Sequence, residues 1–151
     1  MKTLLHIGTE KTGSTSFQTW GAQNRDELAR QGVWYSRELG DVNHVKAYLY
    51  ATPIDAPDEG FGRIKANDPE ARKAFQQELP AKLAAEFADA RAMGCHTFVM
   101  SNEHCQSRLR DQDQVRRLHS LFAPHSDEIE VLCYLRPQID MAVSLLSLIH
   151  I

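Results

Sequence analysis

The sequence lacks any apolar run long enough to cross a membrane. A transmembrane helix needs about 20 consecutive apolar residues, whereas the best candidate, residues 141–151, is shorter and is interrupted by Ser144 and Ser147. The N-terminus also lacks the apolar length of a signal peptide, because His6 ends its first apolar stretch. These absences predict a soluble, cytoplasmic protein with no membrane span.

Cysteine and net charge are also low. The spacing of Cys95, Cys105 and Cys133 fits no zinc or redox motif, so reduced thiols of a cytoplasmic protein are expected. The formal charge of −3 gives no overall basic field and disfavours nucleic acid as a partner. A local basic site for a small anion is compatible with this charge.

Length and composition are those of one ordinary globular domain. The chain has 151 residues, of which 42% are hydrophobic and 25% are charged. This is enough for one compact domain with a core and too few for two comfortable ones. We therefore expect a single domain over residues 1–151, with no internal repeat.

Short apolar or β-branched runs alternate with helical patterns along the chain, which is typical of βαβ units and a parallel sheet. Strands are predicted over residues 3–7, 33–36, 97–100 and 129–135. Helices are predicted over residues 14–30, 41–51, 68–93, from Asp111 or Asp113 onward, and after Pro137, with an irregular segment over 52–68. Pro80 is expected to kink or split the long helix, because it removes a backbone donor. The pattern predicts an α/β fold with a three-layer parallel sheet flanked by helices.

The loop after the first predicted strand has the composition of an anion site. It contains Gly8, Lys11 and Gly13 and then enters a Ser/Thr-rich helix start. Backbone N–H groups in such a loop and the positive end of a helix both favour phosphate. The loop is nevertheless not a Walker A motif. Gly8 and Gly13 have the right separation, but Ser14 takes the lysine position and Lys11 lies two residues before Gly13.

Residues later in the chain also argue against magnesium–triphosphate chemistry. Ser101 and Arg136 follow the third and fourth predicted strands, where a metal-binding carboxylate would be needed. Plain helix capping explains Ser14 as well as phosphate binding does.

Two motifs together indicate a family. The loop from His6 to Ser16 resembles the phosphosulfate-binding loop of sulfotransferases that use 3′-phosphoadenylyl sulfate (PAPS). Arg136 at a strand end, with Ser144 eight residues later in the next helix, resembles the family's second motif. The resemblance is closest to the bacterial and Golgi carbohydrate-type branch. It implies a P-loop NTPase-like sulfotransferase fold that is partial here, because the family normally has a further C-terminal segment.

The resemblance implies in-line sulfuryl transfer from PAPS, without metal, to a hydroxyl or amine of a carbohydrate or small metabolite. Lys11 would stabilise the charge on the bridging oxygen, although a solvated loop lysine is the alternative. Arg136 and Ser144 would hold the 3′-phosphate, unless Arg136 pairs with Asp140. The residues expected to contact the 5′-phosphate are Thr12, Gly13, Ser14, Thr15 and Ser16.

An acceptor hydroxyl also needs a general base. Glu103 is the first candidate and His104 the second, because both follow the third strand and should lie at the sheet edge that carries the loop. His44 is the third candidate. The alternatives are that Glu103 caps a helix or pairs with Arg108, and that His44 is a surface helix residue.

Two other functions are compatible with the sequence. One is a P-loop nucleotide or small-molecule kinase with an unusual loop, which would use Mg-ATP. The other is a non-catalytic, truncated remnant that folds poorly or only binds nucleotide.

Overall fold

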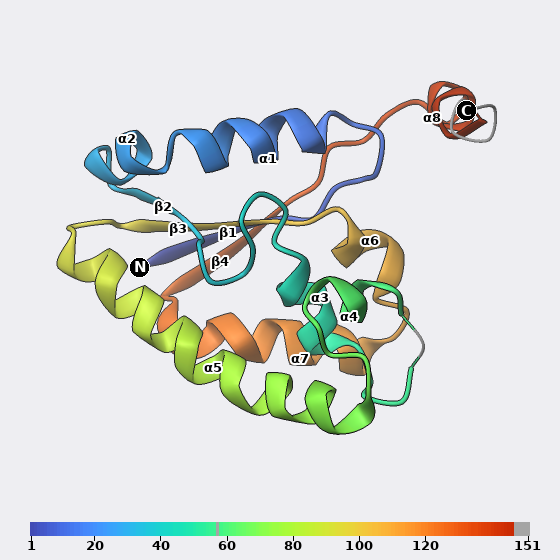
Figure 1. The fold of residues 1–151 in the computed structure, drawn as a ribbon. Helices are drawn as coiled ribbons and strands as arrows, with labels where there is room; N and C mark the ends of the chain where they lie inside the picture. The colour runs from blue at the N-terminus through green and yellow to red at the C-terminus, as the bar shows by residue number, and fades with distance from the viewer. Residues whose placement is uncertain (57, 147–151) are drawn as a thin grey trace.

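Four parallel strands form the centre of the computed structural model, in the spatial order β2-β3-β1-β4 (Figure 1). The structure describes residues 1–56 and 58–146. The strands are β1 (Lys2–His6), β2 (Val33–Tyr35), β3 (Thr97–Ser101) and β4 (Glu128–Leu132). The predicted parallel α/β sheet is confirmed, although β4 ends three residues earlier than expected.

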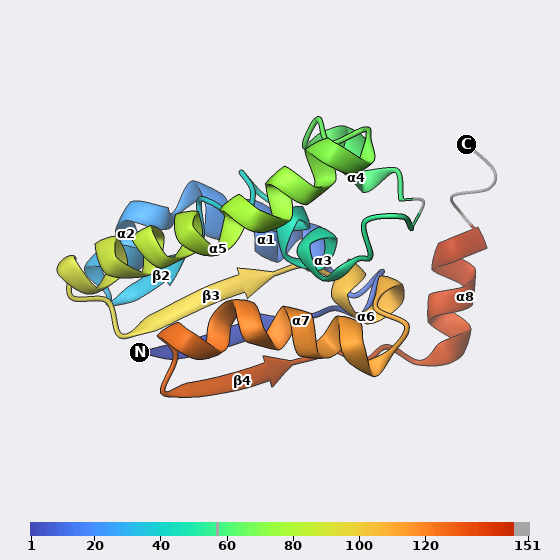
Figure 2. The same cartoon turned by 90° about the horizontal axis from the view of Figure 1, so that it is seen from below.

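Helices cover both faces of this sheet, which gives three layers. Helices α1 and α2 lie over one face, and α5 and α7 lie over the other (Figures 1 and 2). The helices are α1 (Ser14–Gln23), α2 (Arg25–Arg30), α3 (Val45–Ala51), α4 (Gly60–Arg63), α5 (Pro69–Ala92), α6 (His104–Arg108), α7 (Gln112–Phe122), a 3-10 turn (Ala123–His125) and α8 (Gln138–Leu146). Within the described residues, none of these helices has the length and apolar character needed to cross a membrane.

Local chemistry explains where the helices begin and end. Asp68 and Asp111 cap α5 and α7, each accepting a 2.8 Å bond from a backbone N–H three residues later. The helix predicted over 14–30 is interrupted at Asn24, whose backbone N–H and side-chain amide both donate to the Trp20 carbonyl (3.0 and 2.8 Å). Helix α5, by contrast, continues through Pro80. Of the two predicted effects of Pro80, the split is wrong, because the loss of one backbone donor leaves the other helical bonds in place, and the kink stays a prediction.

Two further predicted boundaries differ from the structure. The helix predicted over residues 41–51 begins only at Val45. The segment predicted to be irregular, 52–68, contains the short helix α4.

The main core lies between the sheet and α5 with α7. Phe87 of α5 stacks on Phe98 of β3 with ring centroids 4.0 Å apart, and both rings are fully buried. Phe122 of α7 and Met100 of β3 are also fully buried. Strand β4 is an edge strand and is covered less completely, since Val131 is 57% exposed.

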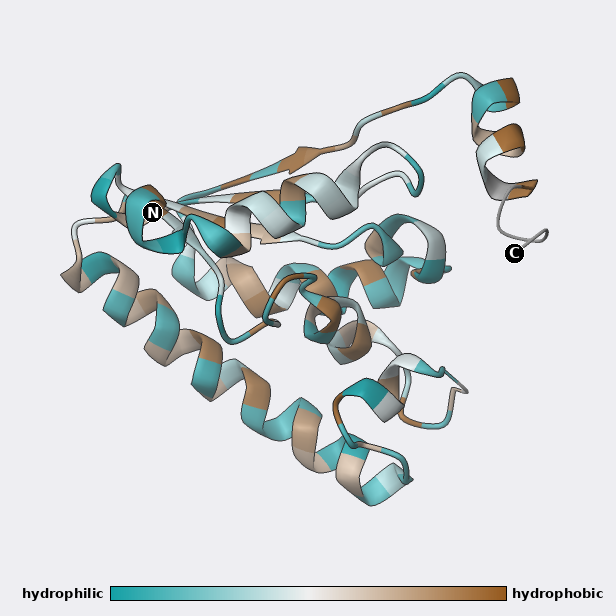
Figure 3. Ribbon diagram, turned by 45° about the horizontal axis from the view of Figure 1, so that its top comes forward, coloured by the Kyte–Doolittle hydropathy of each residue, from teal (hydrophilic) through white to brown (hydrophobic). Residues whose placement is uncertain are grey.

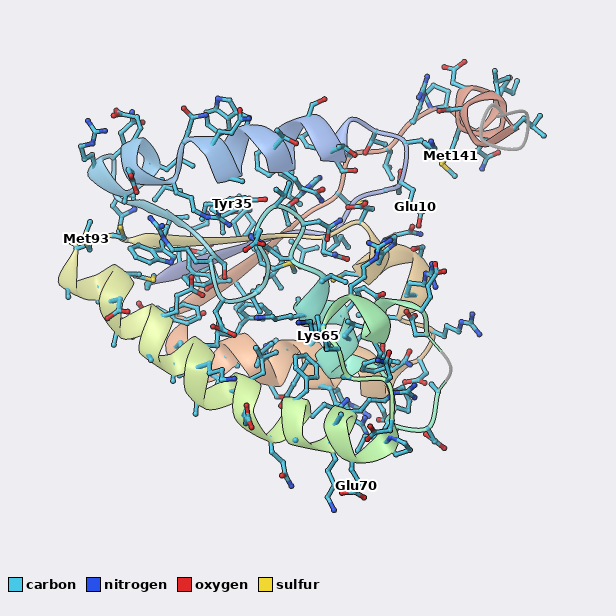
Figure 4. All side chains as sticks on the ribbon, viewed as in Figure 1. Glu10, Tyr35, Lys65, Glu70, Met93 and Met141 are labelled. Atoms are coloured by element: carbon cyan, nitrogen blue, oxygen red, sulfur yellow. The ribbon has the colours of Figure 1, made fainter. Side chains whose placement is uncertain are left out.

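The topology places one crevice at the carboxyl ends of the strands. The chain leaves β1 toward α1 on one face, whereas it leaves the neighbouring β3 toward α6 and α7 on the other side of the sheet (Figure 1). Ligands of open α/β sheets bind where adjacent strands diverge in this way. Figure 4 labels Glu10 at this edge and Met93 at the opposite edge of the sheet.

Loss of the stacked ring at Phe98 should be costly. We expect Phe98→Ala to lower the free energy of unfolding by about 3–5 kcal/mol, because a buried aromatic ring is removed and leaves a cavity. Urea unfolding measures this change. Val115→Ala is the control, because Val115 is 52% exposed, and it should change stability by less than about 0.5 kcal/mol. Equal losses in the two variants would contradict the description of this core.

Candidate active site

Three residues of the loop after β1 have positive φ values. These are Gly8, Lys11 and Gly13, with values of 111°, 61° and 86°. The Thr12 hydroxyl closes the loop by donating to the Thr9 carbonyl (2.6 Å).

Helix α1 begins directly after this loop. Its N-cap is Gly13, which has no side chain to bond the free N–H groups of the first turn. Ser14 is the first helical residue and makes no capping bond, so the alternative of Ser14 as a helix cap is wrong. The open first turn of α1 therefore faces the anion site that the sequence predicts.

The loop packs tightly against the start of α6. A Cβ atom on Gly8 would lie 3.1 Å from the Cα and Cβ of Glu103. Glycine is required here for two reasons, the positive φ value and this close approach. The contact brings the anion loop and the first candidate base together, as the sequence predicts.

Arg136 lies on the other side of the loop. The chain after β4 extends the sheet ladder, since Tyr134 N–H donates to the Gly8 carbonyl (2.7 Å) and Thr9 N–H donates to the Tyr134 carbonyl (2.9 Å). This holds Arg136 beside the loop, where its guanidinium donates to the Lys11 carbonyl (2.9 Å). No ion pair joins Arg136 to Asp140 among the described residues.

Two cavities flank the loop, and Lys11 and Gly13 line both. The cavity on the β4 side has a volume of about 350 Å³ and is lined by Lys11, Thr12, Gly13, Tyr134, Leu135 and Arg136. The cavity on the β3 side has a volume of about 330 Å³ and is lined by Glu10, Lys11, Gly13, Ser14, Thr15, Glu103 and His104. A larger cavity of about 590 Å³ lies beside α5 and α7, and none of the predicted site residues lines it.

Neutral side chains hold Glu103. Gln18 Nε2 donates to its Oε2 (2.6 Å), and Asn43 Nδ2 donates to both carboxylate oxygens (3.2 Å each). Arg108 instead pairs with Asp58 (3.4 Å), so the alternative of a Glu103–Arg108 pair is wrong. Glu103 is the N-cap residue of α6, as the capping alternative expects, but its side chain makes no capping bond. Glu103 also lines the β3-side cavity.

His104 lines the same cavity. Its Nδ1 is 3.4 Å from Glu10 Oε1, outside hydrogen-bond geometry. The Ser107 hydroxyl donates to that Glu10 oxygen (2.7 Å). His104 is placed near the loop as predicted, but its ring is held less firmly than the Glu103 carboxylate.

His44 is not available as a base. It is fully buried; its Nδ1 accepts from Ser101 N–H (2.9 Å) and its Nε2 lies 3.0 Å from the Ser36 carbonyl. These bonds tie the ends of β2 and β3 together and require a neutral ring with the proton on Nε2. Burial, with a contribution from Arg25, lowers the pKa of His44 to about 3. The expectations of a base or a surface residue at His44 are both wrong, because its ring is a buried structural link.

Two predicted phosphate ligands lie outside the cavities. Ser144 is in α8, which stands apart from the sheet in Figures 1 and 2 and lines neither cavity. Ser16 is exposed on α1 and also lines neither cavity. Figure 3 shows apolar residues along α8, and Ile139 and Val143 are 79% and 63% exposed. The binding role of Ser144 stays a prediction.

Sequence reasoning missed Gln18 and Asn43. The sequence held a signal that Gln18 lies near the site. Gln18 is one helical turn after Ser14 and therefore lies on the same face of α1. Asn43 had no comparable signal, since its place follows from the path of the chain between β2 and α3. In the part of the chain that the structure describes, no group of three or more His, Cys, Asp or Glu residues is arranged to hold a metal ion.

Comparison with known proteins gives no match: no protein-family model, curated protein or solved structure is significantly similar to the chain.

The burial of His44 predicts a specific pH dependence. Its pKa in the folded chain is about 3, below the ordinary value of 6.5, so only the unfolded chain takes up this proton between those values. Stability should therefore fall as the pH drops through this window, by up to about 1.4 kcal/mol per pH unit from this residue. His44→Gln removes this titration. In urea unfolding between pH 7 and pH 4, the stability advantage of the wild type over the variant should shrink. A constant difference would contradict the assignment.

Proposed function

We propose that this chain is a PAPS-dependent sulfotransferase domain with a P-loop NTPase-like sulfotransferase fold, acting on a hydroxyl or amine of a carbohydrate or small metabolite. The observation that carries the proposal is the position of Lys11. It lines both cavities, with Arg136 in one and Glu103 in the other. PAPS carries a 5′-phosphosulfate at one end and a 3′-phosphate at the other. One of these anionic groups on each side of the loop suits this arrangement.

The residues present fit such a donor. The loop offers backbone N–H groups, the open first turn of α1 and the Lys11 ammonium for a 5′-phosphosulfate. Arg136 offers a forked set of donors suited to a second phosphate, and only one of them is used by the Lys11 carbonyl. Thr12, Gly13, Ser14 and Thr15 line the cavities and are the proposed 5′-phosphate contacts.

Each residue has a defined task in the proposed reaction. The bound donor supplies an activated sulfuryl group. Lys11 and the loop N–H groups stabilise the charge that develops on the leaving phosphate oxygen. Glu103 takes the proton from the attacking hydroxyl, since Glu103 and Lys11 line the same β3-side cavity. His104 is the second candidate for this proton.

Nucleotide binding separates the proposal from its alternatives. We expect 3′,5′-ADP (PAP, the product nucleotide) at about 100 times its Kd to stabilise the protein by about 2.7 kcal/mol in a thermal shift assay. Arg136→Ala should remove most of this effect, because it removes the second phosphate contact. Arg117→Ala, at an exposed position on α7, is the control and should respond like the wild type. A preference for Mg-ATP would indicate the kinase, and no response to either nucleotide would indicate a non-catalytic remnant.

Lys11 should be essential for the rate and not for the fold. We expect Lys11→Met to lower sulfuryl transfer at least about 100-fold, because one charge-stabilising donor is worth roughly 3 kcal/mol in the transition state. The change is measured as the rate of PAP release. Methionine has a similar length and meets the same positive φ, so the melting temperature should stay close to that of the wild type. Transfer at the wild-type rate would exclude Lys11 from the mechanism.

A further inference from the structure

The Glu103 carboxylate is held by two side-chain amides, and within the described residues it forms no ion pair. Gln18 reaches it from α1 and Asn43 from the segment before α3. These neutral donors orient a partly buried carboxylate without forming an ion pair with it. The group therefore stays available as a proton acceptor.

Further hydrogen bonds, through Asn102, fix the orientation of the Asn43 amide. His104 N–H donates to Asn102 Oδ1 (2.9 Å), and Asn102 Nδ2 donates to Asn43 Oδ1. Asn43 must therefore turn its Nδ2 toward Glu103. Asn102 is fully buried and Gln18 is only 2% exposed, whereas Asn43 and Glu103 are partly exposed.

The bonds also distinguish the two oxygens of Glu103. Among the described residues, Oε2 accepts from both Gln18 and Asn43, whereas Oε1 accepts from Asn43 alone. A carboxylate has about four lone-pair sites, two on each oxygen. The protein therefore occupies both sites of Oε2 and leaves one site open on Oε1.

We propose that Gln18 and Asn43 are positioning residues that present Glu103 Oε1 as the proton acceptor of the sulfuryl-transfer reaction. This rests on the proposed function. As Oε1 takes the hydroxyl proton, the acceptor oxygen bonds to sulfur. The bond from sulfur to the leaving phosphate breaks, and its electron pair stays on the phosphate oxygen.

Helix α1 also links the loop to the residue that holds Glu103. Ser14, beside the anion loop, and Gln18 are both buried and are one helical turn apart. The same rigid turn therefore sets the distance between the donor site and the base. Productive alignment in transfer reactions depends on such fixed distances.

The test compares Gln18→Met with Gln114→Met. Gln114 is also a buried helical glutamine and accepts a side-chain bond from Arg110 N–H, but it lies on α7 away from both cavities. PAP affinity is measured by calorimetry, and turnover is measured as PAP release from PAPS with water as the acceptor. We expect Gln18→Met to bind PAP within about twofold of the wild type and to turn over at least about tenfold more slowly. Gln114→Met should match the wild type in both.

A double variant separates positioning from a general structural effect. If Gln18 acts through Glu103, Gln18→Met should slow the Glu103→Gln variant no further. Equal rate losses in Gln18→Met and Gln114→Met, additive losses in the double variant, or a wild type that binds PAP without turning over PAPS would each overturn the proposal. Failure of the wild type to bind PAP would instead overturn the proposed function, and calorimetry alone reveals it.

Discussion

The close approach of Gly8 to Glu103 is the constraint on which the site depends. It is possible only because β1 and β3 are parallel neighbours whose loops leave toward opposite faces of the sheet. A side chain at residue 8 would meet the backbone and Cβ of Glu103 at 3.1 Å and would push the loop away from the carboxylate. The geometry of the candidate site thus follows from strand order and from the absence of a Cβ atom at Gly8.

A buried polar layer beneath the loop supports this contact. His44 joins the ends of β2 and β3 through Ser36 and Ser101. His6 Nδ1 lies 2.7 Å from the Ser101 hydroxyl, at the level where β1 gives way to the anion loop. Hydrogen-bonded groups of this kind have directional partners and fix one arrangement more narrowly than apolar packing does. The sheet edge is therefore held in register at the point where the candidate site is built.

Much of the fold could be predicted from the sequence, because periodicity and capping residues are local signals. The strands, the starts of α5 and α7 and the parallel arrangement followed from such signals. The break at Asn24 and the continuity of α5 through Pro80 did not, since each depends on which backbone bonds the final helix keeps. Lys11 and Arg136 were proposed as site residues because their motifs resemble those of sulfotransferases, and Glu103 because it follows the third strand. Asn43 was not, because the position of a long connection depends on tertiary packing.

Lys11 has a backbone conformation that L-residues with side chains rarely adopt, with φ at 61°. A left-handed conformation costs a side-chain-bearing residue roughly 1–2 kcal/mol, and glycine avoids most of that cost. Lys65 has the same conformation, with φ at 60°, and lines neither of the two cavities beside the loop. A left-handed lysine in this chain is therefore no mark of function by itself. At residue 11 the local cost in stability accompanies a lysine that lies next to both cavities.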